Sequence, residues 1–312
     1  MISQKLKAKW KDTPLSKYSS LQNRLVQREI LIMDGGMGTE ILHRGEQTTL
    51  PLWSAEALLT NPETVQHIHE DYIKAGAQII ITNTFRTTRR AFAKQGISDK
   101  AQAATILACQ LVQQAIERVS PGHEVYIAGS MAPLEDCYSP ELTPSNQDLL
   151  EEHAIYAQDL KMGGVDFLLL ETMITLRETL AAIQAARQLA LPFAVSFCTD
   201  EQGTLLGGEP LDKVVKEVEK YDPIFLGINC VAPSIATKAL RTLKNVTNKP
   251  LSVYAQGDGA PDDTQGWQFV EENTLDNYMI HVKHWIEEGA QIIGGCCGTS
   301  PAYIERLRRE VA

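Results

Sequence analysis

The chain alternates short apolar runs with longer segments of helical periodicity. From about residue 30 onward, aliphatic and β-branched residues form continuous runs such as Ile79-Ile80-Ile81 and Leu168-Leu169-Leu170. Runs of this kind are typical of strands that are buried on both faces of a parallel sheet. Eight of them predict strands over residues 29–35, 78–85, 124–133, 166–173, 192–199, 223–231, 250–257 and 291–297.

Recognisable helix ends separate these runs. Asn61-Pro62 and Ser300-Pro301 each place a capping residue before a proline, which is typical of a helix start. Gly76, Gly163 and Gly289 come where a helix should end, just before the next apolar run. Eight βα units in succession predict a single (β/α)8 TIM barrel of the α/β class. An open doubly wound sheet is the alternative, because the number of strands alone does not show closure.

Residues 1–29 precede the first predicted strand and form a short N-terminal extension. Their pattern favours an amphipathic helix over residues 21–30, and we expect the segment to be a solvated lead-in. No linker rich in Pro, Gly or Ser divides the rest of the chain, so we expect one barrel domain over residues 30–312. Residues 257–266 are predicted to be a mobile loop at the carboxyl end of the barrel, where active sites of this fold are built.

Composition narrows the class of partner. A chain of 312 residues with 44% hydrophobic content can bury a large core. The net charge of -10 argues against a nucleic-acid or anionic-membrane partner, because both need a basic face. No apolar run approaches the roughly 18 residues of a membrane span, and no apolar stretch follows the N-terminal lysines as in a secretory signal. We therefore expect a cytoplasmic protein that acts on small molecules.

The cysteines predict a metal site. Cys296 and Cys297 are adjacent, so their Cα atoms lie about 3.8 Å apart, whereas a disulfide needs roughly 4.4–6.8 Å. Flanking glycines allow a sharp bend that turns both thiolates toward one ion. Cys230 ends the sixth predicted strand, and in a barrel it faces the same cavity as the end of the eighth strand. We therefore expect Cys230, Cys296 and Cys297 to form one site.

Three thiolates select zinc over magnesium or calcium and leave a fourth position open, as in catalytic sites. Their charge makes zinc a weak activator of water, so binding of a thiol substrate is favoured over hydrolysis. Such a thiol, with a free pKa near ~8.5, would be held as a thiolate at neutral pH. The alternative is that Cys198, at the end of the fifth run, closes a structural site. Cys109 and Cys137 are predicted to be inert thiols.

Polar residues end several other predicted strands. Asp34 with Gly35 predicts either backbone N–H groups open to a ligand carboxylate or a tight turn capped by the aspartate. Glu171 follows three leucines and would be costly to bury unpaired, so it is predicted to bind a ligand ammonium. A structural partner such as Arg177 is the alternative for Glu171. Asn83 ends the second strand at the same mouth and is included among the substrate-binding residues.

Other features change the prediction less. Arg86, Arg89 and Arg90 are predicted to form a solvated helix start, with contact to an anionic group as the alternative. None of the eight runs carries a lysine, which disfavours a Schiff-base aldolase. None carries a His-x-His pair, which disfavours metal hydrolysis of the amidohydrolase type. No Gly-x-Gly-x-x-Gly motif follows a strand in a dinucleotide-binding context.

Four motifs together carry a family resemblance. They are Met33-Asp34-Gly35-Gly36-Met37-Gly38-Thr39, Leu170-Glu171-Thr172, Gly227-Ile228-Asn229-Cys230 and Gly294-Gly295-Cys296-Cys297-Gly298-Thr299. They resemble the homocysteine S-methyltransferase family, which includes betaine-, S-methylmethionine- and S-adenosylmethionine-dependent enzymes and the homocysteine domain of cobalamin-dependent methionine synthase. The resemblance implies that the three cysteines hold Zn²⁺ and that homocysteine sulfur takes the open position. It also implies that Asp34, Gly35 and Glu171 fix the amino-acid end of homocysteine.

We therefore expect a zinc-dependent S-methyltransferase that uses homocysteine and a small-molecule methyl donor. The methyl group would come from an onium donor such as S-methylmethionine, S-adenosylmethionine or betaine, and the product would be methionine. Segment 82–86 is more similar to the methionine synthase branch than to the S-methylmethionine branch, which leaves the donor open. Methylation of another thiol or selenol, and a non-catalytic zinc or redox-sensing barrel, are the alternatives.

Overall fold

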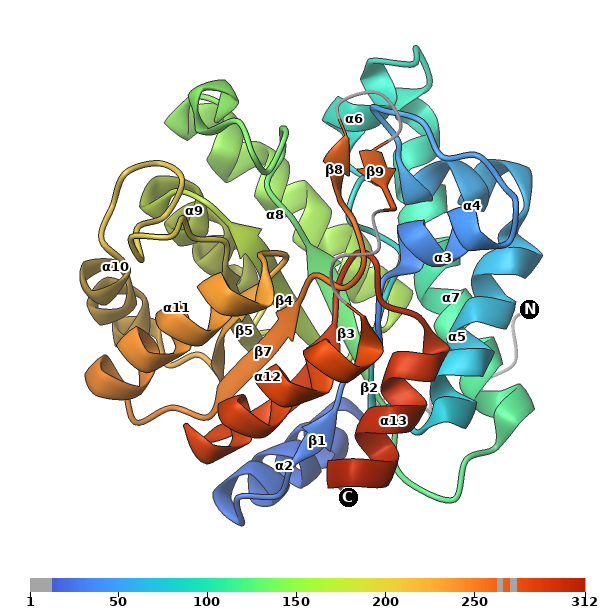
Figure 1. Cartoon of the computed structure of the whole chain (residues 1–312). Helices are drawn as coiled ribbons and strands as arrows, with labels where there is room; N and C mark the ends of the chain where they lie inside the picture. Colours follow the sequence, from blue (N-terminus) through green and yellow to red (C-terminus); the bar gives the residue numbers. More distant parts are fainter. Residues whose placement is uncertain (1–12, 263–265, 270–273, 312) are drawn as a thin grey trace.

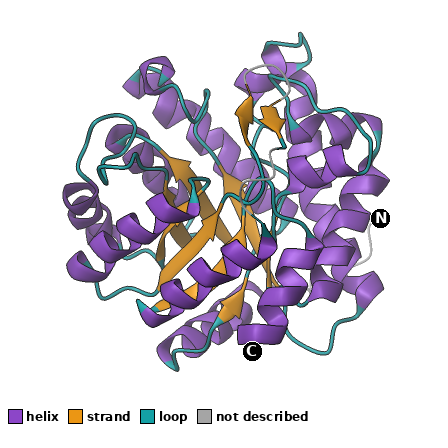
Figure 2. Cartoon of the chain, in the orientation of Figure 1, coloured by secondary structure: helices purple, strands orange, loops and turns teal. Residues whose placement is uncertain are grey.

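The structure is a computed structural model that describes residues 13–262, 266–269 and 274–311. Eight parallel strands stand at its centre and are surrounded by helices (Figures 1 and 2). Along the sheet the strands follow the order β1-β10-β7-β6-β5-β4-β3-β2. Their bounds are β1 Leu31–Ile32, β2 Ile79–Ile81, β3 Tyr126–Met131, β4 Phe167–Met173, β5 Phe193–Phe197, β6 Leu226–Asn229, β7 Leu251–Ala255 and β10 Ala290–Gly295. Seven of them lie within predicted runs, and β10 begins one residue before the predicted run 291–297.

Hydrogen bonds between β1 and β2 close the sheet into a barrel. Met33 and Ile79 form a parallel bridge between the two strands that end the sheet order. The Asp34 N–H donates to Ile79 O at 3.0 Å, and the Gln78 N–H donates to Ile32 O at 2.7 Å. The predicted TIM barrel is therefore confirmed, and the open doubly wound sheet is excluded.

Helices cover the outside of the barrel, and they begin and end where the sequence signals placed them. Pro62 starts α5, Gly76 caps its end at a left-handed φ of 107°, and Pro301 starts α13. No helix of the described residues is long and apolar enough to cross a membrane. The bounds are α3 Met37–His43, α4 Ala57–Thr60, α5 Pro62–Ala75, α6 Arg89–Ala93, α7 Ala101–Val119, α8 Asn146–Gly163, α9 Leu176–Gln188, α10 Leu211–Val218, α11 Pro233–Val246, α12 Leu275–Glu287 and α13 Pro301–Val311.

Strand residues alternate between two cores. On β4, Leu168 and Leu170 pack outward against the helices, while Phe167 and Leu169 point into the barrel. The inner core is filled by large side chains from most strands, so the barrel is a packed interior and not a pore. Its members include Leu31, Met33, Ile79, Tyr126, Phe225, Tyr254 and Ile292. Because both cores are apolar, the strands read as continuous apolar runs.

A helix from the N-terminal extension covers the amino end of the barrel. This helix, α2 (Thr13–Val26), lies at the bottom of Figure 1, on the side opposite the β8–β9 hairpin. Its Leu21 and Leu25 are 1% and 4% exposed and belong to the inner core. Lys17 pairs with Asp166 at 3.2 Å. The helix lies earlier than the predicted 21–30, and the prediction of a solvated segment is wrong for these residues, because the barrel floor needs apolar cover. The domain boundary at residue 30 stays a prediction.

The segment after β7 forms a hairpin above the carboxyl end of the barrel (Figure 1). Strand β8 (Ala260–Asp262) pairs antiparallel with β9 (Gly266–Gln268), and residues 263–265 between them lie outside the described residues. Trp267 is 2% exposed, and its Nε1–H donates to Asp258 O at 3.0 Å. The prediction placed this segment at the correct end of the barrel but missed the hairpin.

Candidate metal centre and substrate cavity

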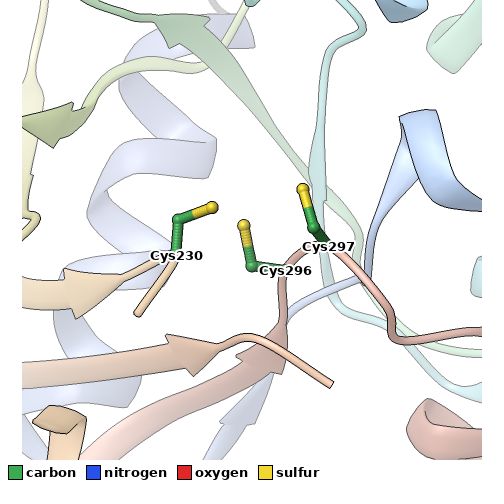
Figure 3. Close-up of side chains that lie close together, drawn as sticks. All are labelled: Cys230, Cys296 and Cys297. Carbon is green, nitrogen blue, oxygen red and sulfur yellow. The ribbon is translucent and has the colours of Figure 1, made fainter. Parts of the chain in front are cut away.

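Three thiols meet at the carboxyl end of the barrel. The sulfur atoms of Cys230, Cys296 and Cys297 all lie within 4.8 Å of one another, and Figure 3 shows the three side chains side by side. Cys230 follows β6, while Cys296 and Cys297 follow β10, with β7 between the two strands. Among the described residues, no other group of three His, Cys, Asp or Glu side chains comes together in this way. The barrel therefore joins sequence positions that are 66 residues apart, as the sequence predicted.

Backbone bonds to β7 hold the two cysteine segments in register. The N–H of Cys230 donates to Tyr254 O at 3.2 Å, and the N–H of Cys296 donates to Ala255 O at 2.8 Å. Cys230 has a left-handed φ of 53°, which is uncommon for a residue with a side chain. β6 ends at Asn229, and the turn at Cys230 directs the Cys230 thiol to the cluster. A strained backbone at this position is typical of a functional site.

The glycines beside the cysteines are needed for close packing. A Cβ on Gly295 would lie 2.2 Å from Thr299 Oγ1, and a Cβ on Gly294 would lie 2.7 Å from Asp34 O. The Thr299 hydroxyl donates to Cys296 O at 2.7 Å and so braces the turn that carries the two thiols. Neither glycine could carry a side chain without moving this turn.

Three further side chains lie next to Cys230. The Tyr138 hydroxyl is 3.2 Å from Cys230 Sγ, and Gln256 Nε2 donates to Cys230 O at 3.1 Å and to Tyr138 Oη at 3.2 Å. Cys198 turns its thiol to Cys230 O at 3.9 Å and is not part of the sulfur cluster. The alternative in which Cys198 supplies a fourth thiolate is therefore wrong for this arrangement. Tyr138 was missed because it lies in an irregular segment with no motif around it.

The thiols need a cation before all three can ionise. Hydrogen bonds from Cys296 and Cys297 lower the pKa of Cys230, and the bond to Cys230 raises the pKa of each of those two neighbours. Without a metal the cluster thus favours one thiolate shared by two thiols. Three soft donors at this spacing, open to a cavity, fit a soft divalent ion that takes thiolate ligands. The cluster could therefore hold a metal.

A cavity of about 420 Å³ opens beside the thiols, in the size range of small-molecule sites. Its wall carries all three cysteines and all four residues predicted to bind substrate, which are Asp34, Gly35, Asn83 and Glu171. Aromatic side chains form much of the remaining wall, namely Trp53, Phe85, Tyr138, Tyr254 and Trp267. The acidic lining residues are Asp34, Asp136, Glu171 and Asp262, and the basic one is Arg86, so acidic side chains outnumber basic ones.

Asp34 and Glu171 are buried carboxylates that face the cavity. Asp34 is 2% exposed; its Oδ2 accepts from the Ile81 N–H at 2.9 Å, while Oδ1 has no partner among the described residues. Burial raises the pKa of Asp34 well above its usual range, against the bond from Ile81. Glu171 is 5% exposed and accepts from the Ser130 hydroxyl. Burial raises the pKa of Glu171 to about 7, opposed by Ser130 and reinforced by Cys230.

In the described part of the chain, no Lys or Arg side chain forms an ion pair with either carboxylate. Arg177, the alternative partner of Glu171, donates to Thr143 O at 2.6 Å and to Pro144 O instead. Two buried acids with a raised pKa and few partners are typical of a site that awaits a cationic ligand. The alternative in which Arg177 pairs with Glu171 is therefore wrong.

Asn83 and Gly35 complete the predicted set. Asn83 Nδ2 donates to Ser54 O at 2.9 Å, and its buried Oδ1 has no partner among the described residues. A Cβ on Gly35 would lie 2.7 Å from Thr299 Oγ1 and 2.8 Å from Tyr72 Oη. The glycine is thus needed so that this turn can pack against Thr299 and Tyr72. All four predicted residues therefore meet at one cavity.

A linkage between β4 and β6 escaped the sequence reasoning. Thr172 has a left-handed φ of 57°, and its N–H donates to Asn229 Oδ1 at 3.0 Å. Asn229 Nδ2 donates in return to Thr172 Oγ1 at 2.8 Å. One amide therefore ties the residue after Glu171 to the residue before Cys230. Asn229 stands in the Gly-Ile-Asn-Cys motif, but the motif does not show which strand it contacts.

The chain is similar to known proteins over nearly its whole length. The family model for homocysteine S-methyltransferase matches residues 31–311. The homocysteine S-methyltransferase of Escherichia coli (strain K12) is 32% identical over 94% of this chain and 99% of its own length. The homocysteine S-methyltransferase YbgG of Bacillus subtilis (strain 168) is 28% identical, over 92% and 96%. The selenocysteine methyltransferase of Astragalus bisulcatus is 27% identical, over 88% and 90%.

Solved structures agree with this result. The crystal structure of the E. coli homocysteine methyltransferase MmuM in its metallated form matches with a TM-score of 0.81 and 29% identity, over 93% of this chain and 99% of that chain. The carboxyl transferase domain of Rhizobium etli pyruvate carboxylase, with a TM-score of 0.54 and 12% identity, shares the fold alone. The family match over nearly the whole chain and the MmuM likeness lead to one conclusion: the chain belongs to the homocysteine S-methyltransferase family.

Proposed function

We propose that the protein transfers a methyl group from an onium donor to homocysteine, giving methionine, with Zn²⁺ held by Cys230, Cys296 and Cys297. Membership of the family makes the chain an enzyme, a methyltransferase that acts on homocysteine, and removes the non-catalytic alternative. One observation carries the finer proposal. Three thiols within 4.8 Å of one another open into a cavity that also holds buried carboxylates with few partners.

The donor set decides the metal. Three thiolates suit zinc better than the hard ions magnesium and calcium, and three protein ligands are typical of a catalytic site with an open position. When bound, zinc lowers the pKa of a thiol that joins it and so supplies homocysteine sulfur as a thiolate at neutral pH. The MmuM structure that matches 93% of this chain is a metallated form, which supports metal binding by this protein.

Asp34, Glu171 and Asn83 bind the ammonium of homocysteine. An ammonium donates three hydrogen bonds, and these three side chains offer acceptor oxygens on the cavity wall. Asp34 Oδ1 and Asn83 Oδ1 lack partners among the described residues, so an ammonium there would satisfy both. Gly35 lets the first turn pack tightly and places Asp34 beside the cavity. The sulfur end of the amino acid is then directed to the cysteines.

The remaining wall suits a cationic donor. Aromatic side chains such as Trp53 and Trp267 attract a sulfonium or ammonium through their ring faces. The four acidic side chains of the cavity wall, against one arginine, also favour a cation. S-methylmethionine, S-adenosylmethionine and betaine all present an onium methyl group.

The chain contributes alignment to the chemical step. Homocysteine sulfur forms a bond to the methyl carbon, the bond from that carbon to the donor heteroatom breaks, and its electron pair stays on the donor. The thiol proton leaves to solvent, so no side chain is needed as a base for the methyl group. Holding both reactants in one cavity gives the rate advantage of a pre-aligned pair.

The compartment and a second acceptor are part of the proposal. All six cysteines are free, which suits a reducing compartment such as the cytoplasm. The likeness to the Astragalus selenocysteine methyltransferase favours a selenol acceptor as a second candidate. Because a selenol is also a soft nucleophile, the same three cysteines would serve it.

A donor screen tests the proposal. Zinc-loaded protein is incubated with homocysteine and, separately, with S-methylmethionine, S-adenosylmethionine, betaine or a methylated folate, and methionine is measured. We expect turnover with at least one onium donor and none with the folate. Cys296→Ala should lose both zinc and turnover, whereas Cys109→Ala, a buried thiol on α7 outside the cavity, should keep both. A Cys296→Ala protein that retains both would contradict the assigned ligand role.

A further inference from the structure

Arg86 is the one basic side chain among the described residues that line the cavity. It lies between β2 and α6, and its side chain is 11% exposed. The other charged residues on the same wall are carboxylates. A buried guanidinium is stable only where anionic or carbonyl oxygens meet its N–H groups, so its partners show whether it is already satisfied.

The neighbours of Arg86 leave part of its guanidinium open. Nη1 donates to Glu135 O at 3.0 Å, and Nη2 lies 3.4 Å from Asp136 Oδ1. The second distance exceeds the roughly 2.7–2.9 Å of a strong charge-assisted bond. Asp136 is 41% exposed and also accepts from Ser139 at 2.7 Å. Arginine has five N–H donors, so these two bonds to described residues leave donors for a ligand.

The two nearby arginines differ from Arg86. Arg89 Nη1 lies 2.7 Å from Asp159 Oδ2, and Arg90 Nε donates to Glu152 Oε2 at 3.0 Å. Both acids belong to α8, and neither arginine lines the cavity. Arg89 and Arg90 thus form close ion pairs outside the cavity, whereas Arg86 lines the cavity.

The hydrogen-bond partners of Arg86 differ from those of the two acids in the proposed homocysteine site. The hydrogen bonds of Arg86 go to Glu135 and Asp136, whereas Asp34 and Glu171 are bonded to Ile81 and Ser130. Arg86 lines the cavity together with Asp136 and Cys137. The guanidinium thus serves a second ligand in the cavity better than the ammonium end of homocysteine.

We propose that Arg86 binds the carboxylate of the methyl donor and thereby selects onium donors that carry a carboxylate. The inference rests on the proposed function. A donor with both charges complements the wall, because its cation meets aromatic rings and its carboxylate meets the planar guanidinium fork. An onium ion without a carboxylate would offer no acceptor to the remaining N–H donors of Arg86.

Two matched sulfonium donors test this selection. S-methylmethionine carries the carboxylate, and (3-aminopropyl)dimethylsulfonium is the same molecule without it. We would measure kcat/KM for homocysteine methylation by the wild type, Arg86→Gln, Arg86→Lys and the control Arg90→Gln. With S-methylmethionine, Arg86→Gln should lose roughly 10- to 100-fold, as for a lost charge-assisted pair, and Arg86→Lys should lose less. With the decarboxylated donor both variants should match the wild type, and Arg90→Gln should match it with both donors.

Other outcomes contradict the inference. An equal loss with both donors would show a structural role for Arg86, and a rise confined to the KM for homocysteine would assign Arg86 to the acceptor. Thermal unfolding checks the fold of each variant, and Arg86→Lys carries the test if Arg86→Gln does not fold. Failure of the wild type to methylate homocysteine with either donor would overturn the proposed sulfonium chemistry itself, and so differs from failure of the selection by Arg86.

Discussion

Replacement of Glu171 by glutamine should stabilise the folded protein at high pH and weaken homocysteine binding. Glu171 is buried, and burial raises its pKa from 4.5 to about 7. Folding therefore favours the protonated acid. Wild-type stability is fully present below pH 4.5 and falls as the pH rises through about 7, because the folded protein must then hold a buried carboxylate.

The magnitude follows from the shift. The pKa of Glu171 rises by about 2.5, from 4.5 to about 7, which corresponds to about 3 kcal/mol at about 1.36 kcal/mol per pKa unit. Glutamine keeps the shape of the side chain and a carbonyl that accepts from the Ser130 hydroxyl, but it carries no charge. The gain in unfolding free energy for Glu171→Gln should be small at about pH 5 and approach about 3 kcal/mol at about pH 8.

Denaturant unfolding of the zinc-loaded protein at about pH 5 to 8 measures this gain. Glu178→Gln is the control, because Glu178 is also buried but accepts from the Leu134 N–H at 2.8 Å and lies 3.2 Å from His153 Nε2. The control should lose stability. In steady-state kinetics, Glu171→Gln should raise the KM for homocysteine roughly tenfold or more, since a charged hydrogen bond is lost. A gain that does not vary with pH, or a loss at about pH 8, would refute the reasoning.

Two further substitutions test the packing of the barrel floor and the hydrogen bonds between β4 and β6. Leu21→Ala should cost about 2–4 kcal/mol in denaturant unfolding, because Leu21 fills the barrel floor, with kcat unchanged; a lower kcat would show coupling to the cavity. Asn229→Ala should cost about 2–4 kcal/mol, because the buried Thr172 N–H and hydroxyl lose their partner, and it should lower kcat. Wild-type stability and kcat in Asn229→Ala would show that the linkage is dispensable.

Much of the fold could be predicted from the sequence. Strands buried on both faces are continuous apolar runs, and these differ from the periodic pattern of the helices between them. The position of helix α2 could not be predicted. Its Leu21 and Leu25 lie in a largely polar segment, and their burial depends on a barrel floor formed by distant strands. The β8–β9 hairpin was missed for a related reason. In the hairpin Trp267 is buried, and the Trp53 ring packs against Gly266, where a Cβ would lie 2.1 Å from it. These are tertiary contacts, which alternation along the short strands does not reveal.

The sequence predicted some residues of the site and missed others. The cysteines were found because adjacent thiols have few other uses and barrel strands converge at one end. Arg86 could not be told from Arg89 and Arg90, because the three share one short segment and only their tertiary partners differ. Tyr138 gave no signal, since an isolated tyrosine in an irregular segment fits many roles.

Zinc coordination measured by X-ray absorption tests the central claim most directly. The account predicts three sulfur ligands and one lighter ligand in the zinc-loaded protein, because Cys230, Cys296 and Cys297 form the cluster and Cys198 does not. Addition of homocysteine should raise the count to four sulfurs. Four sulfurs before homocysteine is added, or a spectrum that homocysteine leaves unchanged, would contradict the account.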